Sequence, residues 1–141
     1  MKDIDLLLQE EIAGYEGDHA DLISKTPAFF RLLTGILEDP TLPGRLRPLV
    51  LVAIAYFALP AEIFPEDLKG PHGYIDDIFL SAWVAGQIRE RMGSEEILLA
   101  NWDGEAPVLP LIQNILSREA ELIGDRRDLI LWYIGYEYLV G

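Results

Sequence analysis

Cysteine is absent from this 141-residue chain, and histidine occurs only twice. Without cysteine there is no disulfide, no thiolate nucleophile and no cysteine-bound zinc. The two histidines, His19 and His72, leave little material for a nucleophilic triad, and no serine stands in a glycine-elbow motif. We therefore assign no catalytic and no cofactor-binding residues from the sequence.

Basic residues are scarce as well. The chain has 11 lysines and arginines against 24 aspartates and glutamates, a formal net charge of −13. Because nucleic acids and anionic lipid headgroups are bound by clustered lysine and arginine, we expect no nucleic-acid partner and little attraction to anionic lipid. The first five residues carry acids where a signal peptide carries bases, which predicts a cytoplasmic protein.

Long hydrophobic runs are also missing. The longest, LVLVAIAYFAL at 49–59, lies between two prolines. As a helix it would span roughly 16 Å, against about 30 Å of bilayer hydrocarbon. It is too short to cross a membrane. A buried core helix is the ordinary interpretation, and a segment lying in a membrane interface is the alternative.

The pattern of apolar residues and helix breakers predicts an all-α fold. No segment alternates with period two, and no repeat or linker divides the chain. We expect one compact helical-bundle domain over 1–141. Prolines, glycines and capping residues predict helices at 3–13, 19–38 with a division at Thr26-Pro27, 41–59, 74–92, 94–102, 107–123, and 125 to about 138.

Two of these helices are apolar on every side. The 49–59 segment has no polar face apart from the hydroxyl of Tyr56, and 74–87 carries apolar residues on opposite sides of its helical wheel. A helix that is apolar all round is buried all round. These two segments are therefore predicted to form a central apolar helix hairpin, with the amphipathic helices packed outside it.

The turn of this hairpin, 60–77, carries five carboxylates and one lysine. It contains Pro60, Glu62, Ile63, Pro65 and Glu66, and then the run Gly73-Tyr74-Ile75-Asp76-Asp77. This pattern resembles the YkvA-like domain family of unknown function, over about Leu32 to Leu80. The chain departs from the family pattern by having glutamate at both positions of the first acid pair and by a loop that is one residue longer. The resemblance implies no agreed activity, and it allows membrane association.

The acid cluster has two interpretations. In the simpler one, Glu62, Asp76 and Asp77 stabilise helix N-termini and cap free backbone amides. In the other, Glu62, Glu66, Asp76 and Asp77 converge on Mg²⁺, Mn²⁺ or Ca²⁺, which bind several carboxylate oxygens. The wheel places both aspartates among apolar residues, and a buried carboxylate needs a partner. Backbone amides, Arg45, Arg47, Lys69 and a metal are the candidates.

Two functional hypotheses follow. The first is a non-enzymatic interaction or scaffolding module, acting on a protein partner, on a second copy of itself or at a membrane surface without spanning it. The absence of a catalytic constellation and the apolar central pair favour it. The aromatic residues of 129–139 are then either core or a docking face. The second hypothesis is a divalent-metal site at the hairpin turn, with hydrolysis as the reaction it would support.

Overall fold

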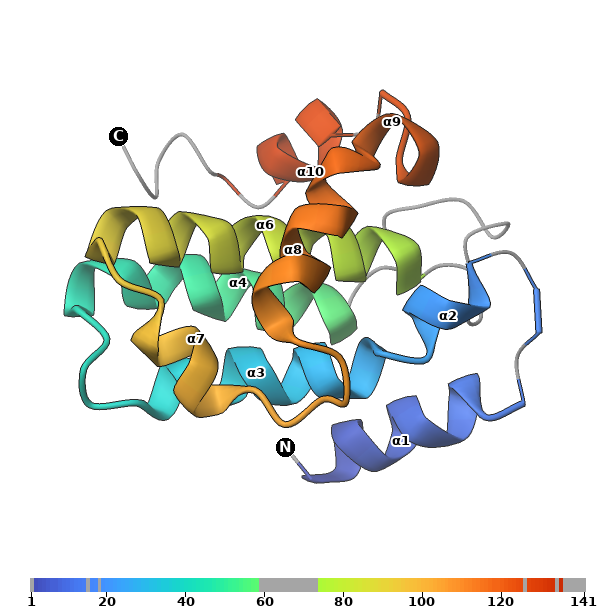
Figure 1. Cartoon of the computed structure of the whole chain (residues 1–141), viewed down its shortest axis with the longest axis horizontal. Helices are drawn as coiled ribbons and strands as arrows, with labels where there is room; N and C mark the ends of the chain where they lie inside the picture. Colours follow the sequence, from blue (N-terminus) through green and yellow to red (C-terminus); the bar gives the residue numbers. More distant parts are fainter. Residues whose placement is uncertain are drawn as a thin grey trace.

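The computed structural model describes residues 2–14, 16–17, 19–58, 74–125, 127–133 and 135 (Figure 1). These residues form helices and turns without a strand, which confirms the all-α fold. The helices are α1 (Lys2–Ile12), α2 (Ala20–Ile23), α3 (Thr26–Glu38), the 3₁₀ turn η1 (Gly44–Leu46), α4 (Arg47–Ala58), α6 (Tyr74–Met92), α7 (Glu96–Asn101), α8 (Val108–Ser117), α9 (Glu119–Leu122) and α10 (Arg127–Tyr133).

Breakers in the sequence account for most helix boundaries. The division at Thr26-Pro27 is confirmed, because α3 begins at Thr26 with a proline in its first turn, where the missing amide costs nothing. After α6, Gly93 adopts φ +67°, a left-handed conformation that glycine reaches without strain. The Ser94 hydroxyl then accepts a hydrogen bond from the Glu96 amide at 3.2 Å, in the turn before α7, whose N-cap is Glu95 and not the predicted Ser94.

Three helices, α3, α4 and α6, pack against one another at the centre of the molecule (Figure 1). The prediction for α6 is confirmed, since nearly every residue from Tyr74 to Ile88 is buried. The prediction for α4 is wrong in part: Leu51 is 47% exposed, and Ala55 is exposed as well. The third side of the core comes instead from α3, which was expected to pack outside the central pair and buries eight residues.

Two further boundary predictions are wrong. The helix expected over 107–123 is divided into α8 and α9 at Arg118, whose amide bonds to the Ile115 carbonyl three residues back, at 3.1 Å. The last helix was expected to run unbroken to about position 138; α10 is described to Tyr133, Gly135 interrupts the helix with φ +70°, and 136–138 lie outside the described residues. Within the described residues, no helix combines the length and the hydropathy needed to cross a bilayer.

The outer helices pack on the central three through a few specific contacts. The ring of Phe29 on α3 lies 5.3 Å from that of Trp102, which follows α7. The Trp102 indole N–H donates to the Ala106 carbonyl at 2.7 Å. On the same side, the Asn101 amide donates to the Asp39 carboxylate at 3.0 Å and to the Ile97 carbonyl at 2.8 Å. These bonds hold α7 and the loop after it against α3.

Candidate functional site

Asp76 and Asp77 lie in the first turn of α6, the most deeply buried helix. Asp76 is 4% exposed and Asp77 is 1% exposed. The start of α6 is at the opposite end of the helix hairpin from the start of α4 (Figure 1). The burial of Asp76 and Asp77 follows from the sequence. Apolar residues cover all sides of α6, so the two aspartates have no polar face to occupy.

The carboxylate of Asp77 is the most unusual group in the described part of the chain. Neither of its oxygens has a hydrogen-bond partner there. The hydroxyl of Ser81, one turn further along the helix, donates to the Asp77 backbone carbonyl at 2.7 Å and not to the carboxylate. Burial raises the pKa of Asp77 well above its usual value, and the neighbouring negative charge of Asp76 raises it further.

This arrangement carries a free-energy cost. A buried polar group without a partner destabilises the folded state by about 1–3 kcal/mol, and by more when it is charged. Helix capping does not remove this cost for Asp77, because a capping carboxylate accepts a backbone N–H and this one accepts none among the described residues. Buried unsatisfied groups are uncommon in native proteins, and a bound ion or water is one of the ordinary reasons for them.

The arginines expected as partners are elsewhere. Arg45 and Arg47 are exposed near the start of α4. The Arg47 guanidinium donates to the Leu37 carbonyl at 2.8 Å. Neither forms an ion pair with the aspartates, so these two candidates are excluded as the partner of the acid pair. Of the other expected partners, Lys69 lies outside the described residues.

Much of the sequence motif also lies outside the described residues. This holds for five motif or cluster positions and for one histidine: Pro60, Glu62, Pro65, Glu66, Gly73 and His72. Tyr74, Asp76 and Asp77 are described and buried. The convergence of four carboxylates therefore stays a prediction. Within the described ranges, no group of three or more histidine, aspartate or glutamate side chains could hold a metal ion.

His19 has a structural environment of its own. Its Nδ1 lies 3.6 Å from a Glu121 carboxylate oxygen and 3.5 Å from an Arg118 guanidinium nitrogen. Arg118 also bonds to Glu121 at 2.6 Å, which lowers the pKa of that glutamate. His19 thus ties the start of α2 to α9.

The structure also contains a cleft that sequence reasoning missed. It has a volume of about 870 Å³ and is lined by residues of α6, α7 and α8. Figure 1 shows that α8 crosses α6. Its apolar lining comes from all three helices: Trp83, Leu98, Leu99, Leu109, Ile112 and Leu116. One sequence signal could have indicated it, namely Gly86, a glycine in the interior of a long helix, where this residue costs stability and usually has a packing or functional reason.

Together these features define a small acidic all-α protein with a buried acid pair and an open cleft. A protein-family model described as "Protein of unknown function (DUF1232)" matches residues 47–83, from the start of α4 to Trp83 on α6. The match includes Asp76 and Asp77. It supports a domain family of unknown function over this region.

One curated relative aligns over most of both chains. Over 133 residues, the chain is 26% identical to the "Uncharacterized protein ORF9" of Methanothermobacter thermautotrophicus, an alignment that covers 94% of this chain and 90% of that protein. No solved structure matches the chain.

Proposed function

We propose that this chain is a divalent-cation-binding helical module whose site is built on Asp76 and Asp77. The single observation that carries the proposal is the Asp77 carboxylate, 1% exposed and without a hydrogen-bond partner in the described structure. This develops the second of the two functional hypotheses. We also propose that the chain is a YkvA-like domain, because Asp76 and Asp77 both lie in the acid motif by which the sequence resembles that family.

The chemistry of the pair fits a hard cation. Two adjacent ionised carboxylates carry two negative charges, and one divalent cation compensates both. Mg²⁺, Mn²⁺ and Ca²⁺ take oxygen ligands, and backbone carbonyls and waters commonly complete their coordination. A protonated Asp77 removes the charge but leaves its polar atoms without partners, so a bound cation satisfies the site more fully. In this proposal Glu62 and Glu66 supply further carboxylate ligands.

Thermal unfolding in chelator, and then with Mg²⁺, Ca²⁺, Mn²⁺ or Zn²⁺ added, tests this proposal. A cation that binds only the native state adds about 2.7 kcal/mol at 100 times its dissociation constant, which raises Tm by several degrees. We expect one of the oxygen-binding cations to raise the Tm of the wild-type chain. We expect Asp77→Asn to remove most of this shift, because a neutral amide is a poor ligand for such ions.

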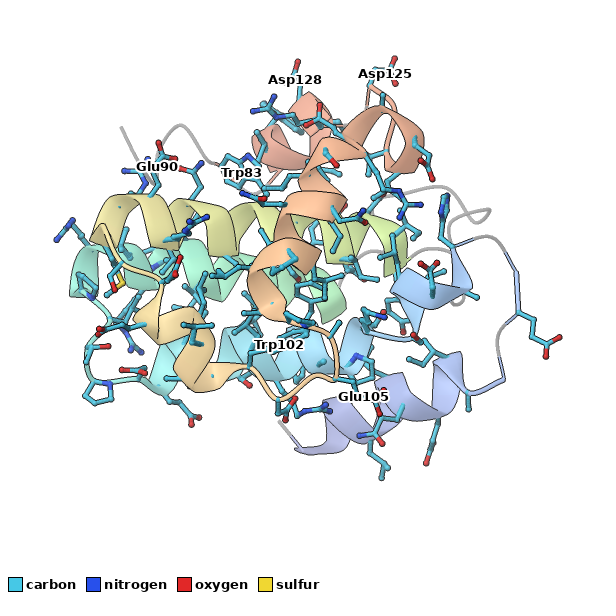
Figure 2. All side chains as sticks on the ribbon, in the orientation of Figure 1. Trp83, Glu90, Trp102, Glu105, Asp125 and Asp128 are labelled. Carbon is cyan, nitrogen blue, oxygen red and sulfur yellow. The ribbon has the colours of Figure 1, made fainter. Side chains whose placement is uncertain are left out.

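Asp128→Asn is the matched control, since Asp128 is also an acid in the first turn of a helix but is exposed on α10 (Figure 2). It should keep the full cation-dependent shift. Glu62→Gln and Glu66→Gln extend the test to the rest of the acid motif. The proposal is wrong if no cation stabilises the wild-type chain, or if Asp77→Asn and the wild type shift equally.

As a second function, we propose that the chain acts as an interaction module that binds a protein partner, a second copy of itself or a membrane surface. Its support is a set of large apolar side chains that remain exposed: Leu6, Leu7, Leu51, Leu99, Leu129 and Trp132, the last at 75%. Gel filtration over a range of concentrations, together with flotation on neutral and anionic vesicles, tests the last two of these modes. A chain that stays monomeric and ignores both kinds of vesicle would rule them out and leave a protein partner.

A further inference from the structure

We propose that the cleft between α6, α7 and α8 binds an amphipathic helix whose apolar stripe is flanked by lysine or arginine. This inference rests on the second function above, the interaction module, and assigns it a surface and a partner of stated chemistry. The acid pair of α6 lies outside the cleft lining, so the cation site and the cleft are separate proposals.

The shape of the cleft favours a helix. Its α6 wall consists of Trp83, Gly86, Gln87, Arg89 and Glu90, and its α8 wall of Leu109, Ile112, Gln113 and Leu116. Apart from Arg89, each wall follows the i, i+3, i+4, i+7 spacing of one helix face. Helix surfaces present ridges and grooves that accept the ridges of another helix. The α6 wall is about 10 Å long, which matches two turns of a bound helix.

Gly86 keeps this space open. A Cβ atom at this position would meet only a methyl group of Leu116, at 3.6 Å, which is an ordinary van der Waals distance. Alanine would fit there and would stabilise the helix by roughly 0.5–1 kcal/mol. Packing within α6 and α8 therefore does not require the glycine. Its absent side chain instead widens the cleft at the crossing of the two helices.

The apolar part of the cleft is incompletely covered. Leu99 on α7 is 54% exposed, and Leu109 and Leu116 on α8 are partly exposed. Trp83 is 8% exposed and contributes its ring at the α6 wall. A volume of about 870 Å³ lies in the range of pockets that bind ligands. The apolar face of a bound helix would bury such a surface, as it does in other helix-in-groove complexes.

The charges at the rim select a basic partner. Glu90, Glu95, Glu96 and Arg89 lie around the opening. Arg89 pairs with Glu95 at 3.2 Å, whereas Glu90 and Glu96 are exposed and have no ion pair among the described residues. Figure 2 shows Glu90 projecting from the C-terminal part of α6, which follows Trp83 in the chain. With a net charge of −13 on the whole chain, lysines or arginines beside the apolar stripe complement this rim.

The probe is a synthetic amphipathic helical peptide made of leucine and lysine, titrated into the full-length chain by calorimetry. Its control is the peptide with glutamate in place of every lysine, which presents the same apolar stripe. We expect the leucine–lysine peptide to bind and the leucine–glutamate peptide not to bind. The indole N–H resonance of Trp83 should shift on binding.

Paired variants separate the cleft from general charge attraction. Leu99→Gln should weaken binding about tenfold, whereas Leu129→Gln, an equally exposed leucine on α10, should change it less than twofold. Glu90→Gln combined with Glu96→Gln should weaken binding about three- to tenfold. Glu38→Gln combined with Glu105→Gln changes the net charge equally, at exposed positions outside the cleft, and should have less than twofold effect.

Two outcomes overturn the inference. One is that the leucine–lysine peptide does not bind; the other is that the cleft variants and their controls lose affinity equally. Neither outcome decides the interaction module itself, because gel filtration and vesicle flotation measure self-association and membrane binding on the wild-type chain. Conversely, a chain that is monomeric and does not bind vesicles, but binds the peptide through Leu99, would support the proposed peptide-binding cleft and neither self-association nor membrane binding.

Discussion

In the presence of a chelator, Asp77→Asn is expected to become progressively more stable than the wild-type chain as the pH rises above about 4. Burial and the charge of Asp76 raise the pKa of Asp77 in the folded state, while the unfolded chain keeps the ordinary value. Between these two pKa values the folded chain binds more protons, so raising the pH lowers its stability. The difference between variant and wild type should grow by up to about 1.4 kcal/mol per pH unit.

Urea unfolding at a series of pH values from about 4 to 8 measures this difference. Taking variant minus wild type isolates Asp77 from other carboxylates. Asp39 and Glu121, for example, have lowered pKa values, and they contribute stability that is lost as the pH falls. A constant offset between Asp77→Asn and the wild type would mean that Asp77 titrates normally, which contradicts its burial.

The second large effect is expected from Phe29→Ala, which should lower the free energy of unfolding by about 3–5 kcal/mol. Phe29 is fully buried on α3, and its ring lies 5.3 Å from that of Trp102. Removing it leaves a cavity between α3 and the loop that follows α7. Because small domains are stable by only about 5–15 kcal/mol, a loss of this size is a large fraction of the total.

Urea unfolding followed by circular dichroism measures the Phe29 effect, with Leu129→Ala as the control. Leu129 is 48% exposed on α10, and its truncation should cost less than about 0.5 kcal/mol. A loss at Phe29 as small as that of the control would show that α3 packs at the periphery, as the sequence pattern had suggested. The expected result would establish α3 as a third core helix beside α4 and α6.

The predictions that succeeded concern features of short range. The start of α6 at Tyr74 and its end before Gly93 depend on residues within about one turn. The N-cap of α7 was predicted one residue too early, since it is Glu95 and not Ser94. The burial of Asp76 and Asp77 could be predicted as well, since a helix that is apolar on every side leaves its few acids no exposed face. The structure therefore confirms the burial of these two candidate residues, and the site that they would form stays a prediction.

The predictions that failed concern which helix faces meet. The outer stripe of α4, with Leu51 and Ala55, has the same composition as its buried sides, and no local pattern distinguishes them. The sequence also left the partner of Asp77 open. Two of the candidates, Arg45 and Arg47, lie at the start of α4, which is at the opposite end of the hairpin from Asp77. The cleft exists only because α6 and α8 cross in the folded chain.

The sequence by itself determined the all-α class, most helix boundaries and the placement of an acid pair inside an apolar helix. These follow from backbone conformation and from hydrophobic periodicity, which act over a few residues. Three features were decided by the tertiary structure alone. They are the place of α3 in the core, the lack of a hydrogen-bond partner for the Asp77 carboxylate among the described residues, and the cleft lined by α6, α7 and α8. Such features depend on contacts between residues far apart in the sequence, for example Asn101 with Asp39, which are 62 positions apart. Contacts of this kind form only when the chain is folded.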